Sequence, residues 1–159
     1  MGNYIIGVLI EPLIIKQNWN FNMLTSLMGA NFILAIFLEP LVGSYTKKYS
    51  RILLYSAVIM CMLALGLTWL GFSENKYYLA YIGQLLYGFG FCVVNTVQAV
   101  YVNQHFKRLN KVTLAFGVRE TFQTAIMAFD FHMIPQIYEG YGNSIGHVLM
   151  VAFFFNLFG

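Results

Sequence analysis

Long apolar stretches separated by short polar ones divide this chain into regular segments. Four apolar stretches, residues 23–42, 52–72, 77–102 and 112–134, are each long enough to cross a bilayer, which takes about 20 helical residues. Two shorter stretches, residues about 4–15 and 145–159, flank them, and we interpret both as truncated spans. Backbone amides in hydrocarbon must bond within their own helix. The pattern therefore predicts an all-α integral membrane protein with four full and two truncated transmembrane helices.

The polar connections alternate in charge. The connections GSYTKKYSR (43–51) and NQHFKRLNK (103–111) hold six of the nine Lys and Arg residues. The connections on the opposite side, SENK and QIYEGYGN, hold one base between them. Basic connections of membrane proteins lie in the cytoplasm. We therefore predict a multi-pass membrane protein with a cytoplasmic N-terminus.

The composition excludes most other classes of protein. Charged residues make up 9% of the 159-residue chain and hydrophobic residues 59%, whereas an ordinary soluble domain is about 25% charged. So few charges cannot cover a water-soluble domain, and so apolar a chain is not disordered. The net charge of +3 is too small and scattered for binding to a nucleic-acid backbone.

The third full span carries a polar stripe. Residues spaced by three and four positions share one face of a helix. A face with three amide side chains is costly against lipid, so it either lines a cavity that binds a polar solute or forms hydrogen bonds to neighbouring helices. Both interpretations stay open. The stripe consists of Gln84, Gly88, Phe91, Asn95 and Gln98.

The fourth full span holds the ionisable residues that are most costly at membrane depth. Arg119 lies about 10 Å, two helical turns, from the start of its span. It either meets an anionic substrate, with Glu120 as a proton-accepting or charge-compensating neighbour, or it extends toward the membrane surface. Asp130 and His132 are expected at the hydrated outer rim, near Pro135, which is expected to end the span.

Residues for enzyme chemistry are missing from the sequence pattern. No Ser-His-Asp or Cys-His arrangement, catalytic carboxylate pair or HExxH motif occurs, and His105 and His147 have no partner at metal-site spacing. We therefore expect no enzyme activity, no catalytic residue, no metal site and no cofactor.

Several stretches together resemble the major facilitator superfamily, and within it the monocarboxylate transporter family (solute carrier 16), especially its invertebrate members. The resemblance covers essentially the whole chain and is fairly specific in the order and spacing of its stretches. The stretches are GVLIEPL (7–13), EPLVGSYTKKYSR (39–51), YGFGFCVVNTVQAVYVNQHFKR (87–108) and IPQIYEGYGNSIGHVLM (134–150).

The resemblance implies that residues 1–159 form an incomplete N-terminal half, with six helices, of a twelve-helix carrier. It implies a secondary transporter in the plasma membrane that moves small monocarboxylates such as lactate or pyruvate together with a proton, with a single-span accessory glycoprotein as a possible partner. The implied cavity residues are Gln84, Asn95, Gln98, Arg119 and Glu120, and the implied cytoplasmic gating loop holds Gly43, Lys47, Lys48 and Arg51.

The chain departs from that family in places. Lys47 stands at an acidic or amide position of the gating loop, Ser50 replaces a glycine, and the first helix lacks the Lys that often couples proton and substrate. Two alternatives therefore remain: a carrier of the same superfamily for another small solute, and a truncated or scaffold membrane protein that does not transport.

Overall fold

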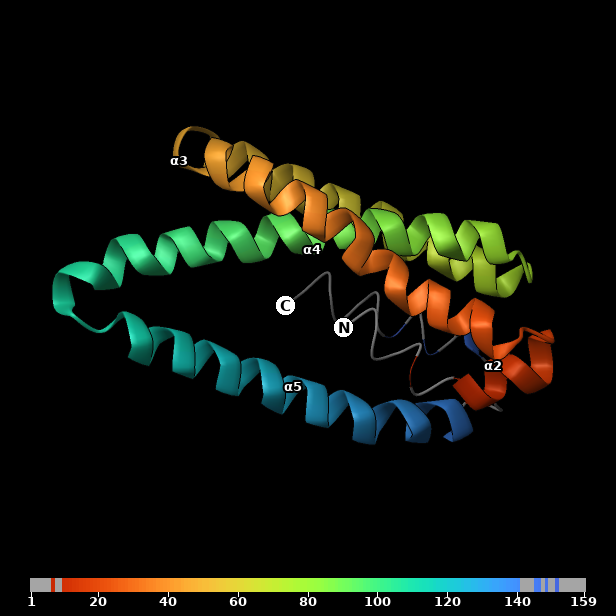
Figure 1. Ribbon diagram of the computed structural model, residues 1–159. Coiled ribbons are helices and arrows are strands. Elements are labelled where there is room, and N and C mark those ends of the chain that lie inside the picture. The colour runs from red at the N-terminus through yellow and green to blue at the C-terminus, as the bar shows by residue number, and fades with distance from the viewer. Residues whose placement is uncertain (1–6, 8–9, 141–144, 147, 149–150, 152–159) are drawn as a thin grey trace.

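The computed structural model describes residue 7, residues 10–140, and residues 145, 146, 148 and 151. Throughout this part of the chain the secondary structure is helical, with short connections and no strand. The helices diverge from one another in places, and α5 is set apart from the pair formed by α3 and α4 (Figure 1). The elements are α2 (Ile10–Gln17), α3 (Phe21–Ser73), α4 (Tyr77–Phe106), the short 3-10 helix η1 (Lys107–Leu109) and α5 (Val112–Gly140).

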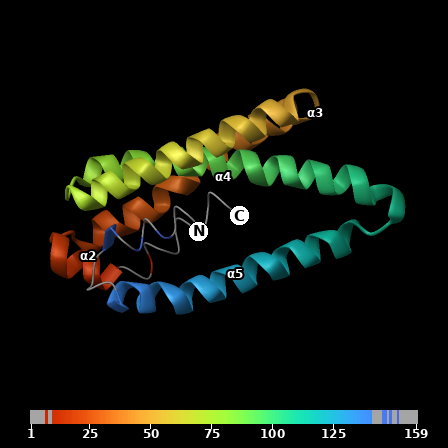
Figure 2. The ribbon, with the colours of Figure 1, turned by 180° about the vertical axis from the view of Figure 1, so that it is seen from behind.

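Element α3 consists of two helical arms joined at a kink, which together form a helical hairpin. The arms, Phe21–Thr46 and Lys48–Ser73, correspond to the first two predicted spans. The arms run in opposite directions beside α4 (Figures 1 and 2). We expected a loop at residues 43–51, but these residues are helical apart from Tyr49, whose backbone has φ −124° and ψ 24°. No residue after Gly43 in this segment strongly breaks a helix, so both arms continue into the turn.

The other connections turn at asparagines. Asn18, Asn75 and Asn110 have φ values of 54°, 53° and 52°, in the left-handed region that Asn adopts more readily than most residues. Asn20 then starts α3, because its side-chain oxygen accepts a hydrogen bond from the backbone N–H of Met23 at 2.8 Å.

Three stretches of the described chain are long and apolar enough to cross a membrane: the two arms of α3 and Tyr77–Leu109. The fourth predicted span forms α5, which is less apolar than these three and contains Arg119 and Glu120. Helix α5 also continues through Pro135 to Gly140, beyond the expected end at residue 134. Proline is tolerated inside membrane helices because neighbouring groups can satisfy the freed carbonyl.

The two shorter apolar stretches, which we predicted to be truncated spans, are only partly described. Helix α2 lies in the first and extends two residues beyond residue 15, to Gln17. Most of residues 145–159 lies outside the described residues.

The connections alternate between two ends of the molecule. The turn of α3 and the connection from α4 to α5 lie at one end, and the connection from α3 to α4 lies at the other end with α2 (Figure 1). The two basic connections, 43–51 and 103–111, therefore share one end, which we call the basic end.

Small residues let α4 pack closely against both arms of α3. A Cβ atom at Gly83 would lie 2.8 Å from the Ala64 carbonyl oxygen in the second arm, and one at Gly88 would lie 2.7 Å from the Asn31 Cα in the first arm. Small residues at such crossings allow helix backbones to approach in membranes. Two apolar clusters complete the packing: one around Leu13, Trp19, Leu24, Leu27 and Phe72, the other around Val42, Ala57, Val93 and Val97.

We predict that Gly88→Ala lowers stability by about 1–3 kcal/mol, since the added methyl group overlaps backbone atoms rather than a flexible side chain. Thermal unfolding of the purified protein in detergent measures the effect. Gly66→Ala is the matched control, because Gly66 is also inside a helix but a Cβ atom added there would have nothing within 4 Å. Equal unfolding temperatures for the two variants would contradict the prediction.

Candidate functional site

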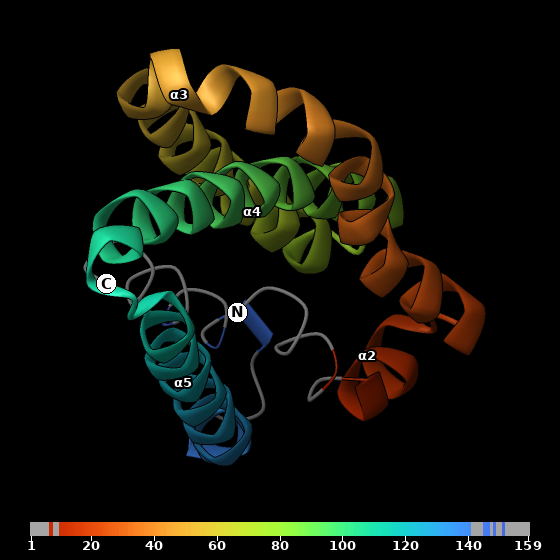
Figure 3. The ribbon, with the colours of Figure 1, turned by 60° about the vertical axis from the view of Figure 1, so that its left-hand side comes forward.

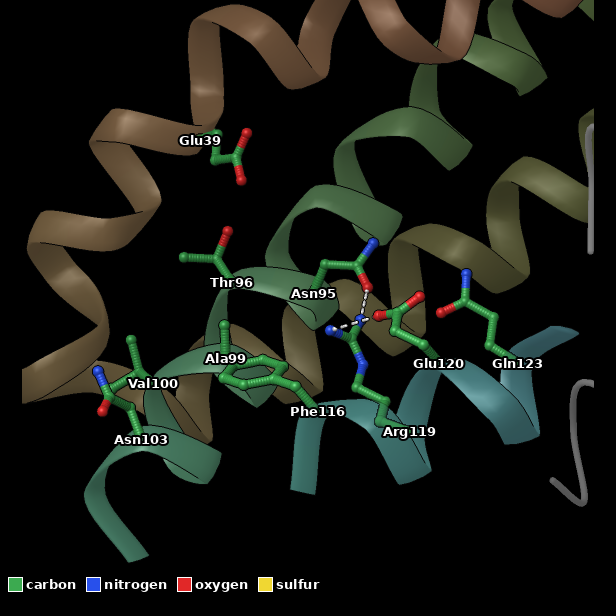
Figure 4. Close-up of a pocket in the computed structure, with 10 residues that line it drawn as sticks. All are labelled: Glu39, Asn95, Thr96, Ala99, Val100, Asn103, Phe116, Arg119, Glu120 and Gln123. Carbon is green, nitrogen blue, oxygen red and sulfur yellow. Dashed lines mark hydrogen bonds and ion pairs between the residues drawn. The ribbon is translucent and has the colours of Figure 1, made fainter. Parts of the chain in front are cut away.

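A polar pocket lies between α4, α5 and the first arm of α3, toward the basic end. Helices α4 and α5 are joined at that end and diverge away from it (Figures 1 and 3). The pocket has a volume of about 550 Å³, within the range of small-molecule sites. Its lining residues are Glu39, Asn95, Thr96, Ala99, Val100, Asn103, Phe116, Arg119, Glu120 and Gln123 (Figure 4).

Helical spacing explains which residues meet at the pocket. Asn95, Ala99 and Asn103 recur every four residues and form one face of α4. On α5, the spacing of Phe116, Arg119 and Gln123 by three and four residues does the same. The pocket is thus the place where these two faces oppose each other, with Glu39 approaching from α3.

Arg119 is the central cation of the pocket. Its Nη2 donates a hydrogen bond to Asn95 Oδ1 on α4, and its Nη1 lies 3.5 Å from Glu120 Oε1 (Figure 4). The Arg119 side chain is 24% exposed and that of Glu120 is 61% exposed. A guanidinium group has five N–H donors, so these two contacts leave donors for a further anion.

Consecutive residues of an α-helix project about 100° apart, so Arg119 and Glu120 need not contact each other. The structure shows that their long side chains nevertheless form an ion pair on the side of α5 that faces α4. A charged pair that also bonds Asn95 is less costly at membrane depth than an isolated guanidinium.

Glu39 enters the pocket from the opposite wall. It lies on the first arm of α3 and extends toward Thr96, across the pocket from Arg119 (Figure 4). Within the described part of the chain its carboxylate has no hydrogen bond or ion pair. The sequence suggested capping or solvation at a span end because Pro40 follows, but α3 continues through Pro40 and keeps Glu39 inside the arm.

Two of the amides expected to line a cavity lie elsewhere. Gln84 is 2% exposed and donates a hydrogen bond to Thr68 Oγ1 on α3 at 3.4 Å, so it joins two helices. Gln98 is exposed and does not line the pocket. In the same stripe, Gly88 packs against α3 and Phe91 is partly exposed, so only Asn95 of the five residues reaches the pocket.

The residues of the expected gating loop lie around the turn of α3. A Cβ atom at Gly43 would lie 3.9 Å from Thr96 Cγ2, an ordinary van der Waals distance, so the first arm passes beside the pocket lining at this residue. Lys48 Nζ lies 5.1 Å from the centre of the Tyr49 ring, and Arg51 is exposed. Lys47 is in the turn, and its side chain lies outside the described residues.

Two further ionisable residues of α5, Asp130 and His132, were expected at the hydrated outer rim. His132 is exposed and its Nε2 lies 3.2 Å from Gln136 Nε2. The side chain of Asp130 lies outside the described residues. Among the described residues no group of three His, Cys, Asp or Glu side chains could hold a metal ion.

Sequence reasoning missed Glu39, Thr96, Asn103 and Gln123 as pocket residues. The signal for two of them was in the spacing: Asn103 lies eight residues, two steps of four, after Asn95, and Gln123 lies four residues after Arg119. Glu39 had no such signal, because it comes from a helix that is distant in the sequence.

Comparison with known proteins gives one family. The model of the Major Facilitator Superfamily matches residues 1–159. No curated protein and no solved structure matches the chain.

Proposed function

The chain belongs to the Major Facilitator Superfamily, and we propose that it carries small monocarboxylates together with protons, as a member of the monocarboxylate transporter family. Membership of the superfamily makes the protein a membrane transporter and not an enzyme. The substrate, the coupling to protons and the role of the polar pocket are our proposals.

The observation that carries the proposal is the environment of Arg119. One of its partners, Asn95, is neutral, and the other, Glu120, is a more exposed carboxylate at 3.5 Å. A carboxylate group of a solute has the same shape and charge as the Glu120 side chain, so it can take the place of Glu120 on the guanidinium. Arginine suits this role because its donors match both oxygens of a carboxylate.

Replacement of Glu120 by a solute also provides coupling to protons. The released Glu120 is an uncompensated charge near the membrane interior, where an ionised carboxylate is costly. The charged groups that face it are Arg119, now bound to the solute, and Glu39 on α3. Uptake of a proton by Glu120 removes this cost. One anion and one proton then enter together, and the charge of the pocket stays constant.

We propose that the carrier works by alternating access, as such carriers usually do. Substrate binds between two halves and is exposed alternately to the two sides. We propose that the basic end and the N-terminus face the cytoplasm, that the loop around Gly43, Lys47, Lys48 and Arg51 takes part in gating, and that the carrier lies in the plasma membrane. A single-span accessory glycoprotein stays a prediction from family resemblance.

Uptake of labelled lactate into proteoliposomes containing the intact carrier tests this function. We expect an inward proton gradient to drive accumulation, with pyruvate competing and glucose not competing. Competition by glucose or by an organic amine, without competition by pyruvate, would indicate a carrier for another solute. Absence of uptake for all of them would favour a protein that does not transport.

Glu120→Gln tests the coupling. The amide keeps the size of the side chain but cannot carry a proton into the cycle, so we expect lactate uptake to lose most of its dependence on the proton gradient. Exchange of lactate against internal lactate should remain. Glu74→Gln is the matched control, since Glu74 pairs with Lys76 at 3.7 Å in the connection after α3 and lies outside the pocket. Unchanged coupling in Glu120→Gln would contradict the assigned role.

A further inference from the structure

We propose that the preferred solute is an amino carboxylate, whose carboxylate group binds Arg119 while its ammonium group binds Glu39. This inference rests on the proposed carboxylate carrier and narrows its substrate class. Glu39 and Arg119 lie on opposite walls of the same pocket, on α3 and α5 (Figure 4).

The charges of the pocket support a solute with two opposite charges. Of the three ionisable residues that line it, Arg119 and Glu120 form an ion pair. Glu39 is left without a partner of opposite charge in the described part of the chain. Once Glu120 is protonated, a simple monocarboxylate would compensate only Arg119 and leave the charge of Glu39 unbalanced, whereas an ammonium group on the same solute would compensate Glu39 as well.

The side of the pocket formed by α4 also suits a solute with an ammonium group and a carboxylate group. The Thr96 hydroxyl group donates its hydrogen to the Cys92 carbonyl at 2.8 Å, so its oxygen can only accept from a solute. Thr96 lies toward Glu39, whereas Asn95 lies toward Arg119 (Figure 4). Acceptors thus gather at the Glu39 side, where an ammonium group would donate, and the cation is at the other side.

The location of Glu39 also supports an amino carboxylate as the solute. It lies inside the first arm of α3, ten residues before the kink at Tyr49, in a stretch apolar enough to cross a membrane. Carboxylates within membrane-spanning helices normally pair with another group or face a watered cavity used for function. The alternative role for Glu39 is to carry a proton while the solute is a simple acid, and competition between matched solutes distinguishes the two.

The experiment compares acids of equal chain length with and without an amine. Glycine, β-alanine and γ-aminobutyrate are each tested as competitors of labelled lactate uptake in proteoliposomes, beside acetate, propionate and butyrate. We expect at least one amino acid of the series to compete about tenfold better than its matched acid. In Glu39→Gln this preference should disappear, because the amide has no charge for the ammonium group, while uptake of the simple acids persists or improves.

Three outcomes decide between the possibilities. If the preference is kept in Glu39→Gln, or if simple acids compete better than amino acids in the unaltered carrier, the inference is wrong. If no carboxylate of either series competes, the proposed function itself fails.

Glu39→Asp, which keeps the charge on a shorter side chain, should retain part of the preference even where Glu39→Gln is poorly produced. Glu139→Gln, at the far end of α5 and outside the pocket lining, is the matched control.

Discussion

Arg119→Gln is expected to reduce the uptake of carboxylates by about 100-fold. The substitution removes the cation of the polar pocket, and loss of one partner of a partly buried charge pair costs about 2–5 kcal/mol. Each 1.4 kcal/mol corresponds to roughly a tenfold change in binding. The initial rate of uptake over a range of substrate concentrations, normalised to the amount of carrier in the proteoliposomes, measures the loss.

Two further variants separate recognition of the carboxylate from general damage. Arg119→Lys keeps the charge but has no planar pair of donors, so we expect it to retain part of the uptake with weaker binding. Arg108→Gln removes a positive charge from the exposed connection after α4, outside the pocket lining, and should leave substrate binding unchanged. Uptake at normal rates by Arg119→Gln would remove the basis of the proposed site.

Asn95→Asp is expected to weaken carboxylate binding by about 10- to 100-fold with almost no change in side-chain size. Asn95 accepts a hydrogen bond from Arg119 through Oδ1. A carboxylate at this position would turn that contact, in which only Arg119 is charged, into an ion pair with direct attraction between opposite charges. Arg119 would then be held by carboxylates on both sides, and a solute would have to displace one of them. Competition curves with lactate measure the effect.

Asn103→Asp is the matched control for this experiment. It places the same new charge in the lining of the same pocket, on the same face of α4, but at a residue that does not bond Arg119. We expect a clearly smaller loss for this variant. If both variants lose affinity equally, a general negative potential, and not competition for the guanidinium group, accounts for the effect.

The membrane-spanning helices could largely be predicted from the sequence, because hydropathy over about 20 residues is a local property. Residues 23–42, 52–72 and 77–102 each fall within a helical stretch that is long and apolar enough to cross a membrane. The ends of the elements could not be predicted as well. The polar residues of 43–51 indicated a loop, yet a single non-helical residue, Tyr49, is enough to reverse the chain.

The residues of the pocket were only partly predictable. Asn95, Arg119 and Glu120, three of the five candidates for a substrate cavity, line one pocket, and their role in binding a substrate stays a prediction. Gln84 and Gln98 belong to the same stripe but lie apart from it, one against α3 and the other exposed. Whether each of these side chains is buried or exposed depends on where α3 covers α4. The spacing of residues along α4 does not contain that information.

The sequence by itself determined that this protein is a bundle of membrane helices with its two basic connections on one side, because hydropathy and charge are read along the chain. The tertiary structure alone decided which polar groups share a pocket. Glu39 and Arg119 are 80 positions apart and meet across one pocket because α3, α4 and α5 present particular faces to one another. The faces of α3 and α4 are set by close packing at residues such as Gly83 and Gly88, which fixes how these two helices are rotated against each other.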